Sequence, residues 1–217
     1  MKRSQLRALI HPLGPAVAAL VVVLAACYPR PVDPVGLPPI PDAFTRLPYL
    51  QDVTDSSAWV LWMPIGGTSD SVVFRVVGQD STWSIAPVED HMGGTRMVLL
   101  APLPPSTEIE YAVISSGSAV GPHTFNTSPR AGVAGDASVS VLLFGDSGWG
   151  GAAQIDLSRQ MAVLDFDLAI HVGDIAYDDG SKEDFTLRHF GVYSRVFDAV
   201  PFYPSVGNHD VRADEGF

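Results

Sequence analysis

The feature that most constrains the fold is an alternation of strand-like and helix-like segments between residues 138 and 206. Apolar runs typical of buried strands occupy residues 138–144, 167–172 and 201–206. Between them, residues 151–166 and 182–200 carry apolar side chains at helical spacing. A strand–helix–strand–helix–strand order requires parallel strands joined by right-handed crossovers. We therefore expect an α/β unit (βαβαβ) in which helices pack on a parallel sheet.

Each of these three strands is followed by a glycine and then by a polar residue: Asp146, Asp174 and Asn208. Polar groups at the carboxyl ends of parallel strands collect at one edge of the sheet. Two carboxylates packed together repel each other unless a cation lies between them, and oxygen ligands suit hard cations. A single Gly-Asp pair after a strand often only caps the next helix. Three in register, the last in "GNHD", instead predict a metal site.

Residues 44–130 follow a different pattern, that of an all-β domain. Short β-rich runs lie at 57–63, 71–78, 96–103, 109–116 and 122–127, separated by Gly, Pro, Ser or Asp. This spacing predicts a small sandwich with core aromatics Trp59, Trp62 and Tyr111. The stretch "LPPSTEIEYAV", followed by "HTFNTSP", resembles the end of a fibronectin type III domain.

The first 27 residues are typical of a cleaved export signal. Lys2, Arg3 and Arg7 precede an apolar run at 16–26 that is too short to span a membrane. The only cysteine, Cys27, ends "LAAC", which resembles a bacterial lipoprotein signal, so we expect lipidation at Cys27 and anchoring to the bacterial cell envelope. The alternative is an ordinary secretory peptide. Residues 28–43, rich in proline, would form an extended linker.

The net charge of −11 argues against a nucleic-acid partner, because neutralising phosphates requires Lys and Arg. Acidity alone does not separate a plain soluble surface from a cation-binding one.

Three sequence blocks together carry a family resemblance. "GDSGWG" (145–150), "GDIAYDDG" (173–180) and "GNHD" (207–210) match in order and spacing the blocks of the calcineurin-like metallophosphoesterases. The tyrosine in the second block, behind a fibronectin-like domain, resembles the purple acid phosphatases. The resemblance covers about residues 46–210 and implies that residues 138–217 form the N-terminal part of a metallophosphoesterase domain. Its implied activity is acid-phosphatase-type hydrolysis of phosphate monoesters, with diesters as further candidates.

Carried over to this chain, the resemblance implies a centre of two metal ions, Fe(III) with Fe(II), Zn(II) or Mn(II). Asp146 would bind the first ion, Asp174 would bridge both, Tyr177 would be a phenolate ligand of the ferric ion, and Asn208 would bind the second ion. His209 would contact the phosphate and protonate the leaving group. The residue pattern alone does not assign Tyr177 as a ligand, because it could equally be a packed aromatic.

The resemblance also implies later histidine ligands, and no histidine follows His209. We therefore expect the 217-residue chain to lack the second half of the catalytic domain and to be inactive by itself. The alternative, from a different functional class, is a non-catalytic surface lipoprotein whose sandwich binds a partner.

Overall fold

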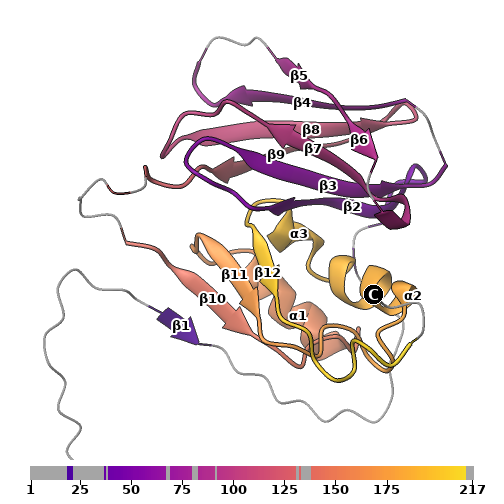
Figure 1. Cartoon of the computed structure of the whole chain (residues 1–217). Helices are drawn as coiled ribbons and strands as arrows, with labels where there is room; N and C mark the ends of the chain where they lie inside the picture. Colours follow the sequence, from indigo (N-terminus) through magenta and orange to yellow (C-terminus); the bar gives the residue numbers. More distant parts are fainter. Residues whose placement is uncertain are drawn as a thin grey trace, which may run out of the picture.

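A computed structural model of the chain describes residues 19–21, 37, 39–66, 69–79, 83–90, 92–130, 132 and 138–213. These residues form a β-sandwich and an α/β unit that packs against it (Figure 1). The expected lipidation site, Cys27, lies outside the described residues, as does most of the proline-rich segment 28–43.

The sandwich consists of two antiparallel four-stranded sheets, ordered β2-β3-β7-β6 and β5-β4-β8-β9. The strand bounds are β2 Phe44–Gln51, β3 Ala58–Pro64, β4 Asp70–Val76, β5 Ser84–Ala86, β6 Glu89–Asp90, β7 Arg96–Leu100, β8 Glu108–Ser115 and β9 Ser118–Asn126. A short 3₁₀ turn, η1 (Met92–Gly94), precedes β7. The five β-rich runs predicted from the sequence correspond to β3, β4, β7, β8 and β9.

The sandwich core follows from the alternation of side chains along its strands. On β8, Ile109, Tyr111 and Val113 are fully buried, while the residues between them are only partly buried. Trp62 of β3 is also fully buried and packs in the same core. Trp59, predicted as a core aromatic, is only partly buried and packs instead against the core of the α/β unit.

The α/β unit has a parallel sheet ordered β1-β10-β11-β12, which confirms the predicted strand direction. Its strands are β1 Ala19–Val21, β10 Val141–Phe144, β11 Leu168–His171 and β12 Phe202–Pro204. The helix α1 (Ala152–Met161) connects β10 to β11. It ends five residues before the predicted end at Phe166, because the chain turns there to enter β11, with Asp167 N donating to Ser140 O at 2.9 Å.

The second predicted helix, 182–200, is broken into three pieces. They are α2 (Lys182–Asp184), the π-helical segment η2 (Phe185–Phe190) and α3 (Ser194–Phe197). Gly191 N donates to Thr186 O at 2.9 Å, which is the five-residue spacing of a π turn. Gly191 and the β-branched Val192, which follow the wider turn, are weaker helix formers than Ala or Leu. His189 lies within the turn and is fully buried.

The two halves share a buried interface. Tyr49 and Leu61 of the sandwich belong to the same core cluster as Phe144, Ala169 and other buried residues of the α/β unit. The interface also contains hydrogen bonds: the hydroxyl of Tyr111 donates to Asp198 O at 2.7 Å. The sandwich therefore packs, through β2, on α3, on η2 and on the strand β12.

The opposite face of the parallel sheet is less covered. Leu143 and Ile170 alternate with buried neighbours, are only partly buried, and belong to none of the core clusters of the described residues. Val172 and Val206, just beyond β11 and β12, are 56% and 57% exposed. The described residues also include no helix long and apolar enough to cross a membrane.

Candidate metal centre

The three predicted polar residues follow three neighbouring parallel strands. Asp146 comes two residues after the end of β10, Asp174 three residues after β11, and Asn208 four residues after β12. Because β10 pairs with β11 and β11 with β12, all in parallel, the three residues leave the sheet at the same edge. β10 ends at Phe144 as the sequence predicted, whereas β11 and β12 end one and two residues earlier, and all three polar residues stand on loops.

Both aspartates adopt a left-handed backbone, with φ of 50° at Asp146 and 53° at Asp174. The two turns are hydrogen-bonded to each other: Asp146 N donates to Gly173 O at 3.1 Å, and Ser147 N donates to Asp174 O at 3.3 Å. A non-glycine residue in this conformation costs about 1–3 kcal/mol and persists only where the surroundings enforce it. The structure thus holds two carboxylates side by side in strained turns.

The hydroxyl of Tyr177 lies between these two carboxylates. It is 2.9 Å from Asp146 Oδ1 and 3.2 Å from Asp174 Oδ2. Burial raises the pKa of Tyr177, and its hydrogen bond to Asp146 raises it further, so the phenol keeps its proton. The phenol proton thus lies between the two carboxylates. A cation bound by both carboxylates at this place would reduce the repulsion between them. The ring also stacks on Trp149, with ring centroids 4.3 Å apart.

Asp210 is a site residue that the sequence reasoning missed. It is fully buried, and its Oδ1 accepts hydrogen bonds from Ile175 N at 2.7 Å and Ala176 N at 3.0 Å. Its Oδ2 accepts from Gly207 N at 2.7 Å. The carboxylate thus ties the loop after β11 to the loop after β12. Its signal in the sequence was its place at the end of the "GNHD" block.

Gly207 has to be a glycine because the two loops approach so closely. A Cβ at this position would lie 2.0 Å from Asp174 N and 2.2 Å from Asp174 Oδ1. Any larger residue would push Asp174 away from Asp146, so the Gly-Asn-His turn and the Asp174 turn form one packed unit.

His209 and Asn208 lie at the outer side of this unit. His209 N donates to Asp174 Oδ1 at 2.9 Å, and its ring centroid is 4.3 Å from that of Tyr177. His209 Nδ1 is 2.6 Å from Asp178 O and 2.8 Å from Arg212 Nη1, and it can serve only one of them at a time. Asn208 is exposed and makes no hydrogen bond within the described residues. Its amide is free to bind a ligand.

His171 lies beneath the site and is not one of its ligands. Gly173 N donates to His171 Nδ1 at 3.2 Å, so the proton is on Nε2, which lies 2.8 Å from Ser147 Oγ and donates to it. Burial lowers the pKa of His171 to about 4, so the ring is neutral. The imidazole therefore fixes the turns that carry Asp146 and Asp174.

The donors brought together are chemically suited to a hard metal ion. They comprise the carboxylates of Asp146 and Asp174, the phenol oxygen of Tyr177 and, at the outer side, the amide of Asn208. The described residues contain no group of three or more His, Cys, Asp or Glu side chains close enough to hold a metal ion. The site thus supplies oxygen ligands but few of them.

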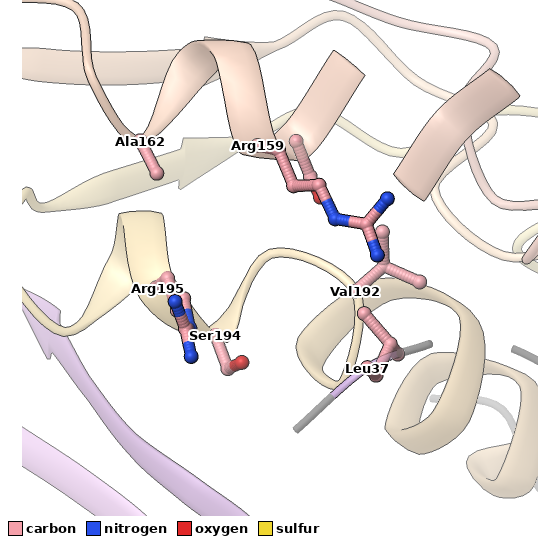
Figure 2. Close-up of a pocket in the computed structure, with 7 residues that line it drawn as sticks. Leu37, Arg159, Ala162, Val192, Ser194 and Arg195 are labelled. Atoms are coloured by element: carbon pink, nitrogen blue, oxygen red, sulfur yellow. The ribbon is translucent and has the colours of Figure 1, made fainter. Parts of the chain in front are cut away.

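A separate pocket of about 240 Å³ lies between α1 and α3 (Figure 2). Its lining includes Leu37, Arg159, Ala162, Val192, Ser194 and Arg195, and none of the metal-site donors.

No family model matches the chain. Purple acid phosphatase 7 of Arabidopsis thaliana is 38% identical over 88 residues, which is 36% of this chain and 27% of that protein. The chain thus spans only about a quarter of this curated relative. Among solved structures, PhoD aligns with a TM-score of 0.58 and 14% identity over 79% of this chain and 40% of that one, which shows a shared fold. A human fibronectin type III domain aligns with a TM-score of 0.31 and 18% identity, covering 46% of this chain and 92% of that domain.

The chain is thus similar over part of its length to a purple acid phosphatase, as its three sequence blocks predicted.

Proposed function

We propose that the chain carries part of a dinuclear metal centre that hydrolyses phosphate monoesters, with diesters as further substrates. The observation that carries the proposal is the contact of one hydroxyl, that of Tyr177, with the carboxylates of Asp146 and Asp174. Two carboxylates held this close in strained turns are explained by a cation that they share. Because the chain spans only part of its relatives, turnover is proposed for the whole protein.

Each residue has a defined role in this proposal. Asp174 lies centrally, since Oδ2 faces Tyr177 and Oδ1 accepts from His209 N, and it would be the ligand shared by both ions. Asp146 and Tyr177 would hold the first ion, and Asn208 would hold the second. His209 orients the phosphate and donates a proton to the leaving oxygen. Two metal ions, Fe(III) with Fe(II), Zn(II) or Mn(II), would neutralise phosphate charge and activate the attacking water.

Metal affinity tests the proposal on the chain as it exists. Titrating Mn²⁺ into the full chain by calorimetry should give binding that Asp174→Asn weakens at least about tenfold, because a carboxylate shared by two ions is lost. The matched control is Asp178→Asn, which removes an exposed carboxylate from the same loop. The control should bind like the wild type. Equal affinity of Asp174→Asn and the wild type would contradict the proposal.

A second readout identifies the phenol ligand. Fe(III) added to the chain should produce a visible charge-transfer band that Tyr177→Phe abolishes, since the phenolate oxygen is its source. A band that persists in Tyr177→Phe would remove this residue from the ligand set.

We also propose that Cys27 is acylated and anchors the exported protein to the envelope of a bacterial cell. The support is the "LAAC" boundary and the proline-rich segment after it. The strand β1 lies within the predicted signal, so cleavage before Cys27 would remove it from the edge of β10. In a bacterial host, the wild type should partition into detergent and Cys27→Ser into the aqueous phase. Equal partitioning would refute the anchor.

A further inference from the structure

A second pocket lies at the seam between the sandwich and the α/β unit. It has a volume of about 210 Å³, and β2 contributes Arg46 and Gln51 to its lining. The α/β unit contributes His189 and the aromatic rings of Phe185, Phe190 and Phe202. None of the proposed metal ligands lines this pocket. Its exposed rim residues, Lys182 and Pro204, show that it opens to solvent.

Arg46 is an unusual residue for this position. It is only 9% exposed, and among the described residues no carboxylate lies within ion-pair distance of it. One Nη donates to Thr186 Oγ1 at 3.0 Å, and the guanidinium lies 3.8 Å from the ring centroid of Phe190. Its Nε has no hydrogen-bond partner among the described residues. A buried cation without a counter-ion is costly, so Arg46 has unused capacity to pair with an anion.

His189 provides a second, independent sign of a missing ligand. Its side chain is fully buried, and neither ring nitrogen has a hydrogen-bond partner among the described residues. Burial lowers the pKa of His189 well below its ordinary value, so the ring is neutral and offers one donor and one acceptor. Buried polar atoms are satisfied in most proteins, and two unsatisfied groups in the lining of one pocket point to something that binds there.

The remaining lining is mostly apolar. Phe185, Phe190, Phe202 and Ile175 surround the polar atoms, which would make the pocket a poor host for a bare hydrated ion. Apolar cavities of about 150 Å³ accept benzene, so this pocket can hold a ring that carries one acidic group.

We propose that the seam pocket binds a small organic anion, with its acidic group on the Arg46 guanidinium and its apolar body against Phe185, Phe190 and Phe202. Arg46 comes from the sandwich and the three rings from the α/β unit, so the ligand contacts both halves. Its binding should stabilise their packing against each other.

Benzoate and phenylphosphonate are suitable probes, with acetate lacking the apolar body and benzyl alcohol lacking the charge. Calorimetry on the full chain measures binding. A chelator in the buffer removes metal ions, so that the probes cannot bind through the proposed metal centre. Benzoate, phenylphosphonate or both should bind and raise the melting temperature, while acetate and benzyl alcohol bind at least about tenfold more weakly. The tighter of the two probes identifies the acidic group. If neither probe binds the wild type, the proposal is wrong, and the proposed metal function is unaffected.

Variants then locate the binding. Arg46→Met keeps a long side chain without the charge and should weaken binding at least about tenfold. The matched control is Arg195→Met, which removes the same charge from the exposed rim of the other pocket. It should bind like the wild type. Binding that Arg46→Met retains would overturn the proposal.

A readout on the wild type keeps the test valid should Arg46→Met fail to fold. The protein is labelled with ¹⁵N-histidine, and the ring signals of His189 are identified because they are absent from His189→Phe. These signals should shift when the probe that binds, benzoate or phenylphosphonate, is added to the wild type. His189→Phe preserves an aromatic ring in the cluster and removes both nitrogens. Ring signals of His189 that do not move on saturation with either probe would contradict the proposal.

Discussion

The two halves of the molecule use their strands in different ways. In the sandwich, two antiparallel sheets face each other across one core, and most strands have five to nine residues. In the α/β unit, strands of three or four residues are buried on one face and partly covered on the other. The long strands give the sandwich its stability through buried area. The short strands mainly bring three loops to one edge.

The same contrast holds for strained backbone. Asp52, Ser106 and Ser116 in the sandwich also have positive φ, but they lie in the connections β2–β3, β7–β8 and β8–β9, away from the two carboxylates at Tyr177. Asp146 and Asp174 instead follow parallel strands and carry the carboxylates that meet at Tyr177. Backbone strain alone therefore does not identify the site, whereas strain combined with converging charge does.

The largest effect expected from the contrast is on the sandwich core. Trp62→Ala should reduce the free energy of unfolding by about 3–5 kcal/mol, because a fully buried indole leaves a cavity. Urea denaturation measures it. The control Trp83→Ala removes an indole that is 36% exposed and should cost much less. Equal losses would mean that the sandwich core does not supply the stability.

Acid should weaken the α/β unit before the sandwich. Burial lowers the pKa of His171 to about 4, whereas the unfolded chain protonates this residue near 6.5. Its contribution to stability is therefore fully present above about pH 6.5 and is lost as the pH falls toward 4. The lowered pKa of buried His189 acts in the same direction.

Hydrogen exchange checks this expectation. Between pH 7 and pH 5, after correction for intrinsic exchange rates, amides of β11 should lose more protection than those of β3. An equal loss in both strands would contradict it.

Asp210→Asn should lower the free energy of unfolding by about 1–3 kcal/mol. Both oxygens of the Asp210 carboxylate accept backbone N–H groups, and the amide NH₂ of asparagine would leave at least one of these N–H groups without an acceptor. The loss should appear as faster hydrogen exchange at Ile175 and Ala176 with β3 unchanged. Asp178→Asn, on the exposed part of the same loop, is the control and should exchange like the wild type. Unchanged exchange at Ile175 in Asp210→Asn would show that the carboxylate does not hold the two loops.

The smallest expected effect concerns the seam. Tyr111→Phe removes the hydrogen bond to Asp198 O and should cost about 0.5–1.5 kcal/mol in urea denaturation. Tyr203→Phe, which alters a tyrosine that is 39% exposed, should cost less. A larger loss for Tyr203→Phe would mean that the seam hydrogen bond is unimportant.

The sequence predicted what depends on local periodicity, namely the strand–helix alternation and the meeting of three strand ends. It did not predict β2 as a strand, and this strand contains a proline, Pro48. β2 is an edge strand with an irregular register around Pro48, where a missing N–H is tolerated. The roles of Asp210, Arg46 and His189 depend on contacts across 34 to 143 residues, which no local pattern encodes.

In the proposed centre, a metal ion binds where the three parallel strands end. Adding Mn²⁺ to ¹⁵N-labelled chain measures this directly, because the paramagnetic ion broadens the amide signals nearest to it. We expect the strongest broadening at residues 145–147, 173–175 and 207–209, with the sandwich strands β3 and β8 spared. Broadening centred on other acidic residues, such as Asp156 or Asp165, would contradict it.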